Sequence, residues 1–180
     1  MAIKTFTTGE VLTASDTNTY LANSGLVYVT SATIGSGVSS VTVSNCFSST
    51  YDNYRIIYSG GVGTASPQAL QIKMGSTAAG YYNALSYVSY STGATSTAVV
   101  NNGSQWSYVG EASSALTWVC IDVLNPFLTK YTQFGGSYVG SVAGNCGGYL
   151  ADTTSYTAFS LISPTTLTGG TITVYGYRKA

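Results

Sequence analysis

Near its C-terminus the chain reads Thr171-Ile172-Thr173-Val174-Tyr175-Gly176-Tyr177, in which apolar and polar side chains alternate with a period of two residues. In an extended strand the two Thr side chains and Tyr175 fall on one face, while Ile172, Val174 and Gly176 fall on the other. This alternation is typical of a β-strand with one buried face. The stretch therefore predicts a sheet that covers an apolar core.

The same pattern extends over most of the chain. From Leu26 onward, short segments rich in Val, Ile, Thr and Tyr are separated by Gly-rich turns such as Gly60-Gly61. No helical period interrupts them, so parallel βαβ units are not expected. The sequence predicts an all-β fold of some eight to ten strands, an antiparallel β-sandwich or jelly roll. Besides Gly170–Tyr177, the candidate segments for these strands are Leu26–Ala32, Ser39–Val43, Tyr54–Ser59, Ala69–Met74, Leu85–Tyr90, Gln105–Gly110, Leu116–Leu124, Tyr131–Val139, Gly147–Ala151 and Tyr156–Ser163.

Two segments stand outside this strand pattern. The polar stretch Ser91–Gly103 is expected to be a long exposed loop. At the N-terminus, Thr13 and Asp16 have the spacing of a helix N-cap, which predicts a short helix over Ala14–Asn23. A helix of this length is marginal in water and needs a surface to lie on. We therefore expect an N-terminal arm, residues 1–25, followed by one β-domain, residues 26–180.

Charge is scarce in this sequence. Charged residues make up 7% of the chain, against about 25% in ordinary soluble domains, and six acidic residues balance six basic ones. No basic stripe exists for nucleic acid or an anionic membrane, and no apolar run is long enough to span a bilayer. The polar character comes from 25 Ser, 26 Thr and 21 Gly. A neutral surface favours self-association, which suits a protein that works within an assembly.

The residue types needed for most catalytic chemistry are missing. The chain has no His, which excludes Ser-His-Asp and Cys-His catalysis and imidazole metal sites. Phosphate-binding Gly motifs are absent as well. Cys46, Cys120 and Cys146 contain no C-x-x-C pair, so neither a disulfide framework nor a zinc site is expected, and the apolar run around Cys120 predicts a buried thiol. We expect no enzyme activity, no cofactor and no metal.

One kind of enzyme remains an alternative, a glycoside hydrolase, because glycoside hydrolysis needs only two carboxylates. Asp52 and Asp152 lie in turn-like segments, where hydrogen bonding to local backbone amides is the ordinary role of Asp. Asp122 lies within a strand and is expected to pair with a cation, for which the candidates are Arg55, Lys73 and Lys130. The full set of carboxylates is Glu10, Asp16, Asp52, Glu111, Asp122 and Asp152.

The 16 tyrosines have two possible uses. Tyrosines on inward faces, such as Tyr58, are expected to fill the core or a subunit contact. Tyrosines in loops or on outer faces, together with Ser, Gly and Asn, would form a surface suited to a protein partner or to sugar rings. The candidates for glycan or partner contact are Tyr81, Tyr82, Tyr87 and Tyr90.

Two parts of the chain resemble bacteriophage proteins. The first, Phe6-Thr7-Thr8-Gly9-Glu10-Val11-Leu12-Thr13-Ala14-Ser15-Asp16-Thr17-Asn18-Thr19-Tyr20-Leu21, resembles the N-terminal segment of phage tail-associated and other virion proteins. The second is similar to a β-rich domain of structural proteins from marine and freshwater phages, especially cyanophages. It comprises Tyr51-Asp52-Asn53-Tyr54-Arg55-Ile56, Leu124-Asn125-Pro126-Phe127, Gly148-Tyr149-Leu150 and Thr168-Gly169-Gly170-Thr171-Ile172-Thr173-Val174-Tyr175-Gly176-Tyr177-Arg178.

The resemblance implies a non-enzymatic virion structural protein of the tail-fibre or capsid-decoration type, with a jelly-roll-like domain. It also implies a homo-oligomer, with a trimer favoured, that is assembled in the host bacterial cytoplasm and binds other capsid or tail proteins through its N-terminal arm. The residues expected to make this attachment are Phe6, Val11, Leu12, Tyr20 and Leu21.

The location on the particle stays open at this point. The chain is short for a whole tail fibre and has no shaft repeat, so a capsid decoration protein or a head fibre competes with a receptor-binding tip. The alternative function is a receptor-binding or free carbohydrate-binding module that recognises host-surface polysaccharide.

Overall fold

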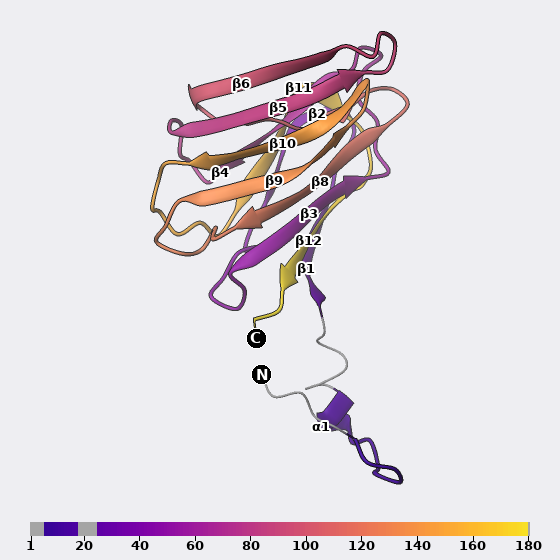
Figure 1. Ribbon diagram of the computed structural model, residues 1–180, viewed down its shortest axis with the longest axis vertical. Coiled ribbons are helices and arrows are strands. Elements are labelled where there is room, and N and C mark those ends of the chain that lie inside the picture. Colours follow the sequence, from indigo (N-terminus) through magenta and orange to yellow (C-terminus); the bar gives the residue numbers. More distant parts are fainter. Residues whose placement is uncertain (1–5, 18–24, 180) are drawn as a thin grey trace.

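Twelve strands lie in the residues that the computed structural model describes, 6–17 and 25–179 (Figure 1). They are β1 (Leu26–Thr33), β2 (Val38–Val43), β3 (Asn53–Ser59), β4 (Gln68–Met74), β5 (Tyr81–Ser89), β6 (Thr95–Gly103), β7 (Trp106–Ala112), β8 (Thr117–Leu124), β9 (Thr132–Val139), β10 (Val142–Leu150), β11 (Phe159–Leu167) and β12 (Thr171–Tyr177).

The strands form two layers that face each other (Figure 1). The large sheet has the order β1-β12-β3-β8-β9-β10-β5-β6, and the small sheet has the order β2-β11-β4-β7. Every pair is antiparallel. The layers meet at β8, because its first residues pair with β7 while Ile121–Leu124 pair with β9. The predicted all-β antiparallel sandwich is confirmed.

The connections follow a jelly roll. Going along the chain, β2, β4, β7 and β11 lie in the small sheet, and β3, β5, β6 and β8 lie in the large sheet. These eight strands, four in each sheet, alternate between the sheets as two Greek keys do. The hairpin of β9 and β10 is inserted between β8 and β5, and β12 and β1 extend the large sheet beyond β3.

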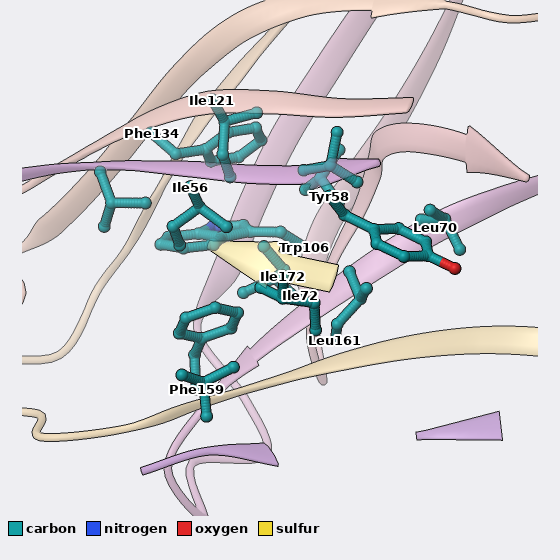
Figure 2. Packing of buried hydrophobic residues seen from close by; sticks show 14 of the residues in the cluster. Ile56, Tyr58, Leu70, Ile72, Trp106, Ile121, Phe134, Phe159, Leu161 and Ile172 are labelled. Carbon is teal, nitrogen blue, oxygen red and sulfur yellow. The ribbon is translucent and has the colours of Figure 1, made fainter. Parts of the chain in front are cut away.

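The core lies between the two sheets and follows the period-two pattern of the sequence. Ile172 and Val174 are fully buried on the inner face of β12, as predicted. Trp106 of β7 lies at the centre (Figure 2), with its ring centroid 4.8 Å from that of Phe134 and 5.6 Å from that of Tyr81. Large aromatic side chains of this kind contribute much of the buried apolar area that stabilises a core.

Two sequence predictions are wrong in this part of the chain. The segment Ser91–Gly103, expected to be a loop, contains strand β6. This strand lies at the edge of the large sheet and is largely exposed, so few of its positions needed to be apolar. Cys120, expected to be buried, is half-exposed because it faces outward on β8, whereas Cys46 and Cys146 are buried.

The N-terminal segment contains a single helical turn, α1 (Ala14–Asp16). Its predicted N-cap is confirmed, since the Asp16 amide donates to Thr13 Oγ1 at 3.1 Å and the Thr13 amide donates to Asp16 Oδ2 at 3.1 Å. Of the rest of the predicted helix, Thr17 is the C-cap, and residues 18–23 lie outside the described residues. None of the helical residues in the described ranges forms a helix long and apolar enough to cross a membrane.

Candidate binding surface

Three tyrosines stack in a row on the outer face of the large sheet. The rings of Tyr82 and Tyr149 are nearly parallel, with centroids 5.0 Å apart and an interplanar angle of 14°. Tyr131 stacks on Tyr149 with a centroid distance of 6.0 Å and an angle of 5°. Tyr149 and Tyr131 keep 41% and 49% of their surface exposed. We refer to Tyr82, Tyr149 and Tyr131 as the tyrosine row.

Strand pairing places these rings side by side. Tyr149 of β10 is the direct partner of Tyr82 on β5, and Tyr131 precedes the first residue of β9. Along β5 and β10 the side chains alternate between the core and the solvent. Tyr81 and Leu150 are fully buried, while their neighbours Tyr82 and Tyr149 face outward. Aromatic side chains that are directly opposite on one face of a sheet stabilise each other in this way.

Beside the tyrosine row the sheet has an almost flat strip. Gly147 precedes Tyr149 by two positions on the outer face of β10, and it pairs with Gly135 on β9 and with Ala84 on β5. A Cβ atom added at Gly135 would meet nothing within 4 Å, so this position opens to the solvent. The strip continues to Val99 of β6, which pairs with Ala84 and is 71% exposed. We refer to Gly135, Gly147, Ala84 and Val99 as the glycine strip.

Three shallow hollows follow the row and share its residues. One of about 450 Å³ includes Tyr82, Tyr149 and most of the glycine strip, and one of about 490 Å³ includes Tyr131, Tyr149 and Gln133. A third, of about 600 Å³, extends from Tyr82 past the end of β10 to Asp152. Their volumes lie in the range of small-molecule sites. No Lys or Arg lines any of the three, and Asp152 is their one charged residue.

Asp152 is held by hydrogen bonds at the end of the third hollow. Its carboxylate accepts from the Thr154 amide at 2.9 Å, from the Tyr156 hydroxyl at 2.8 Å and from the Thr77 hydroxyl at 3.2 Å. The Thr154 and Tyr156 hydrogen bonds hold the pKa of Asp152 below its usual range. The carboxylate is therefore ionised at neutral pH and makes this end of the surface electronegative.

The sequence prediction for contact tyrosines is corrected in part. Tyr82 belongs to the tyrosine row and is half-buried, but Tyr81 is fully buried and its hydroxyl donates to the carbonyl of Thr77 at 3.1 Å, so Tyr81 offers no surface contact. Tyr87 points inward and packs against the core. Tyr90 is 64% exposed but lies in the turn after β5, at the opposite end of that strand from Tyr82.

Tyr131 and Tyr149 were missed by the sequence analysis. The alternation of Tyr149 with the apolar Leu150 was a signal that Tyr149 faces outward. Its stacking with Tyr82 depends on pairing between segments far apart in the chain, which one sequence does not reveal.

The residues predicted to attach the chain to a particle lie in the N-terminal segment. Val11 and Leu12 are 79% and 49% exposed, and Phe6 is 38% exposed. Figure 1 shows this segment beyond the end of the sandwich where β1 begins. Tyr20 and Leu21 lie outside the described residues.

The carboxylates of the sandwich each have identified partners. Arg55 donates to Asp122 through Nε and Nη2, both at 2.8 Å, so the predicted cation partner of Asp122 is Arg55. Asp52 pairs with Lys179 at 2.7 Å, and Glu111 is buried. Across the described ranges, no three Asp, Glu, Cys or His side chains come together as a metal site would require.

A comparison of the sequence with protein-family models finds no match, and neither does a comparison with curated proteins.

Proposed function

We propose that this chain is a non-enzymatic structural protein on the surface of a bacteriophage particle, attached to the capsid or the tail through its N-terminal arm. The observation that carries the proposal is the exposure of Val11 and Leu12 in a segment apart from the sandwich. Exposed apolar side chains gain free energy when a partner covers them. An arm of this composition is suited to docking on another virion protein, as the resemblance of its sequence to virion N-terminal segments implies.

The edge of the large sheet supports assembly with further copies. In the described residues β6 pairs with β5 alone, so its other edge is open. Proteins that stay monomeric commonly protect such an edge with Lys or Pro. The nine residues of β6 contain neither of these and no charged side chain. This edge favours a homo-oligomer, and we propose a trimer as its form.

The absence of enzyme activity is part of the same proposal. It is supported by the lack of His in the sequence and by the structural partners of the carboxylates on the sandwich. Asp122 and Asp52 are bound to cations, and Asp152 accepts hydrogen bonds from Thr77, Thr154 and Tyr156. Such carboxylates are already used to hold the fold together.

Binding to particles tests the proposal. The full-length protein should bind virions that lack it, and its mass in solution, measured by light scattering, should correspond to an oligomer. The double variant Val11→Asp/Leu12→Asp should lose particle binding, because it places charge in the arm. Val88→Asp is the matched control, because it places the same charge on an exposed valine of the sandwich, of which 42% of the surface is exposed. A double variant that binds as well as the control would disprove attachment through the arm.

A second candidate function is a receptor-binding or free carbohydrate-binding module. It is favoured by the tyrosine row, because exposed tyrosines beside small polar residues suit a binding surface. The two functions differ in a simple measurement. A free module would be a monomer that binds glycans and does not bind phage particles. A virion protein would bind the particles whether or not it binds glycans.

A further inference from the structure

We propose that the tyrosine row and the glycine strip bind a neutral polysaccharide chain. This inference rests on the glycan-binding role considered above and gives it a site and a class of ligand. It holds for a virion protein that contacts the host surface as well as for a free module.

The tyrosine row offers apolar surface that remains open to a ligand. In a stack of three rings, the central ring of Tyr149 is covered by its neighbours, while Tyr82 and Tyr131 each have one face that no ring of the row covers. The hollows of about 450 and 490 Å³ lie beside these two tyrosines. A sugar ring has an apolar C–H face and a polar rim, and tyrosine pairs a flat apolar ring with a hydroxyl.

The glycine strip lets an extended chain come close to the sheet. Gly135 and Gly147 have no side chains, and Ala84 between them and β6 adds a single methyl group. A ligand lying across β9, β10 and β5 would contact the ring edges on one side while resting on nearly bare backbone. Glycine in a strand often marks such a close approach.

Polar groups around the row match the rim of a sugar. The amides of Gln133 and Asn101 line the two hollows that flank it. Amides both donate and accept hydrogen bonds, as sugar hydroxyls do. The hollows are open and shallow, so the outer hydroxyls of a bound sugar would stay in water. An entirely apolar ligand would gain less, because most of its surface would remain exposed.

Charge selects the class of ligand. No Lys or Arg lines the three hollows, and the ionised Asp152 lies at one end. A sulfated or uronic-acid polysaccharide lying in the hollows would meet no cation there and one repelling carboxylate. The nearest cations lie outside the hollows: the exposed Lys130 precedes Tyr131, and Arg55 is already paired with Asp122 beside Gly135. Single-stranded nucleic acid also stacks on aromatic rings, but it requires basic residues along its backbone. A neutral polysaccharide satisfies both the aromatic and the electrostatic character of the surface.

Affinity electrophoresis of the full-length protein tests the inference. The probes are dextran, a soluble mannan and hydroxyethyl cellulose as neutral polysaccharides, with alginate as the anionic control. We expect retardation by at least one neutral probe and none by alginate. Tyr149→Ala removes the ring on which both Tyr82 and Tyr131 stack, so it should weaken that binding by about tenfold, which corresponds to about 1.4 kcal/mol. Tyr90→Ala removes an exposed tyrosine outside the hollows and should leave binding unchanged.

Folding of each variant is checked by its thermal unfolding. If Tyr149→Ala is unstable, Tyr131→Ala replaces it, because Tyr131 lies outside the strands and is 49% exposed. The inference is overturned if no neutral probe retards the protein, if alginate retards it equally, or if the row variants bind like Tyr90→Ala. Particle binding by Tyr149→Ala separates the two proposals, since attachment through the arm predicts that it stays normal.

Discussion

Glu111 of β7 accepts a hydrogen bond of 3.0 Å from the hydroxyl of Tyr138 on β9, and both side chains are buried in the core. The same carboxylate accepts from the Ser141 hydroxyl at 2.7 Å and from the Ser141 amide. Ser141 lies in the turn between β9 and β10, so Glu111 ties the inserted hairpin to the small sheet. Gly140 is required beside it, because a Cβ atom there would lie 2.3 Å from Glu111 Oε1.

We therefore expect Glu111→Ala to be strongly destabilising. Removing the carboxylate leaves buried donors without an acceptor, which costs about 2–4 kcal/mol in the free energy of unfolding. Urea denaturation measures this loss. Asp52→Ala serves as the contrast, since its ion pair with Lys179 is exposed and is worth about 0–1 kcal/mol. Equal effects of the two substitutions would contradict a special role for Glu111 in holding the hairpin.

Thr132 offers a substitution in the opposite direction. Its side chain is fully buried, and in the described part of the chain its hydroxyl has no hydrogen-bond partner. Valine has nearly the same shape and removes this unsatisfied group, so Thr132→Val should raise the free energy of unfolding by about 1 kcal/mol. Thr97→Val, on the exposed strand β6, should change it by less than about 0.5 kcal/mol. A destabilised Thr132→Val protein would show that the hydroxyl has a partner after all.

Acidification should weaken the fold through two aspartates. Burial raises the pKa of Asp122, but the hydrogen bonds from Arg55 and Tyr177 outweigh this effect and hold the pKa below its usual range. The hydrogen bonds from Thr154 and Tyr156 likewise lower the pKa of Asp152. The unfolded pKa is about 3.9. Their stabilisation is thus complete above that value and is lost as the pH falls through the lower folded pKa values. Urea midpoints measured from pH 6 down to pH 2 should fall, and less steeply in Asp122→Asn. A decline that is unchanged in this variant would assign acid sensitivity to other groups.

The three cysteines should differ in reactivity. Burial raises the pKa of Cys46 to about 12 and that of Cys146 to about 11, so neither forms a thiolate near pH 8. Cys120 is half-exposed on the outer face of β8. Because the thiolate is the reactive form, a thiol reagent should modify one cysteine in the native protein and all three after denaturation. The Cys120→Ser variant is the control and should show no rapid native reaction.

Local pattern was sufficient for the fold class but not for the binding surface. The alternation in 171–177 predicted strand β12 and its buried face, and Thr13 with Asp16 predicted the capped turn. Strand β6 was missed because an exposed edge strand rich in Thr, Ser and Asn has the composition of a loop. The tyrosine row depends on the pairing of β10 with β5, and the burial of Tyr81 beside the outward-facing Tyr82 depends on which face of β5 meets the core. Both are properties of register, which one sequence does not specify for strands with tyrosines on both faces.

Two glycines of the hairpin should respond oppositely to the same substitution. At Gly148 an added Cβ atom would lie 2.2 Å from the Tyr82 carbonyl oxygen and 2.5 Å from Asn83 Cβ, so β10 could no longer lie as close to β5. Gly148→Ala should therefore lower the free energy of unfolding by about 1–3 kcal/mol. Gly135→Ala meets nothing within 4 Å and should be neutral or slightly stabilising, because glycine is unfavourable within a strand. Thermal unfolding gives both values. If Gly135 belongs to the floor of a glycan site, Gly135→Leu should keep a normal unfolding temperature and still lose retardation by the neutral polysaccharide, a combination that a purely structural glycine would not produce.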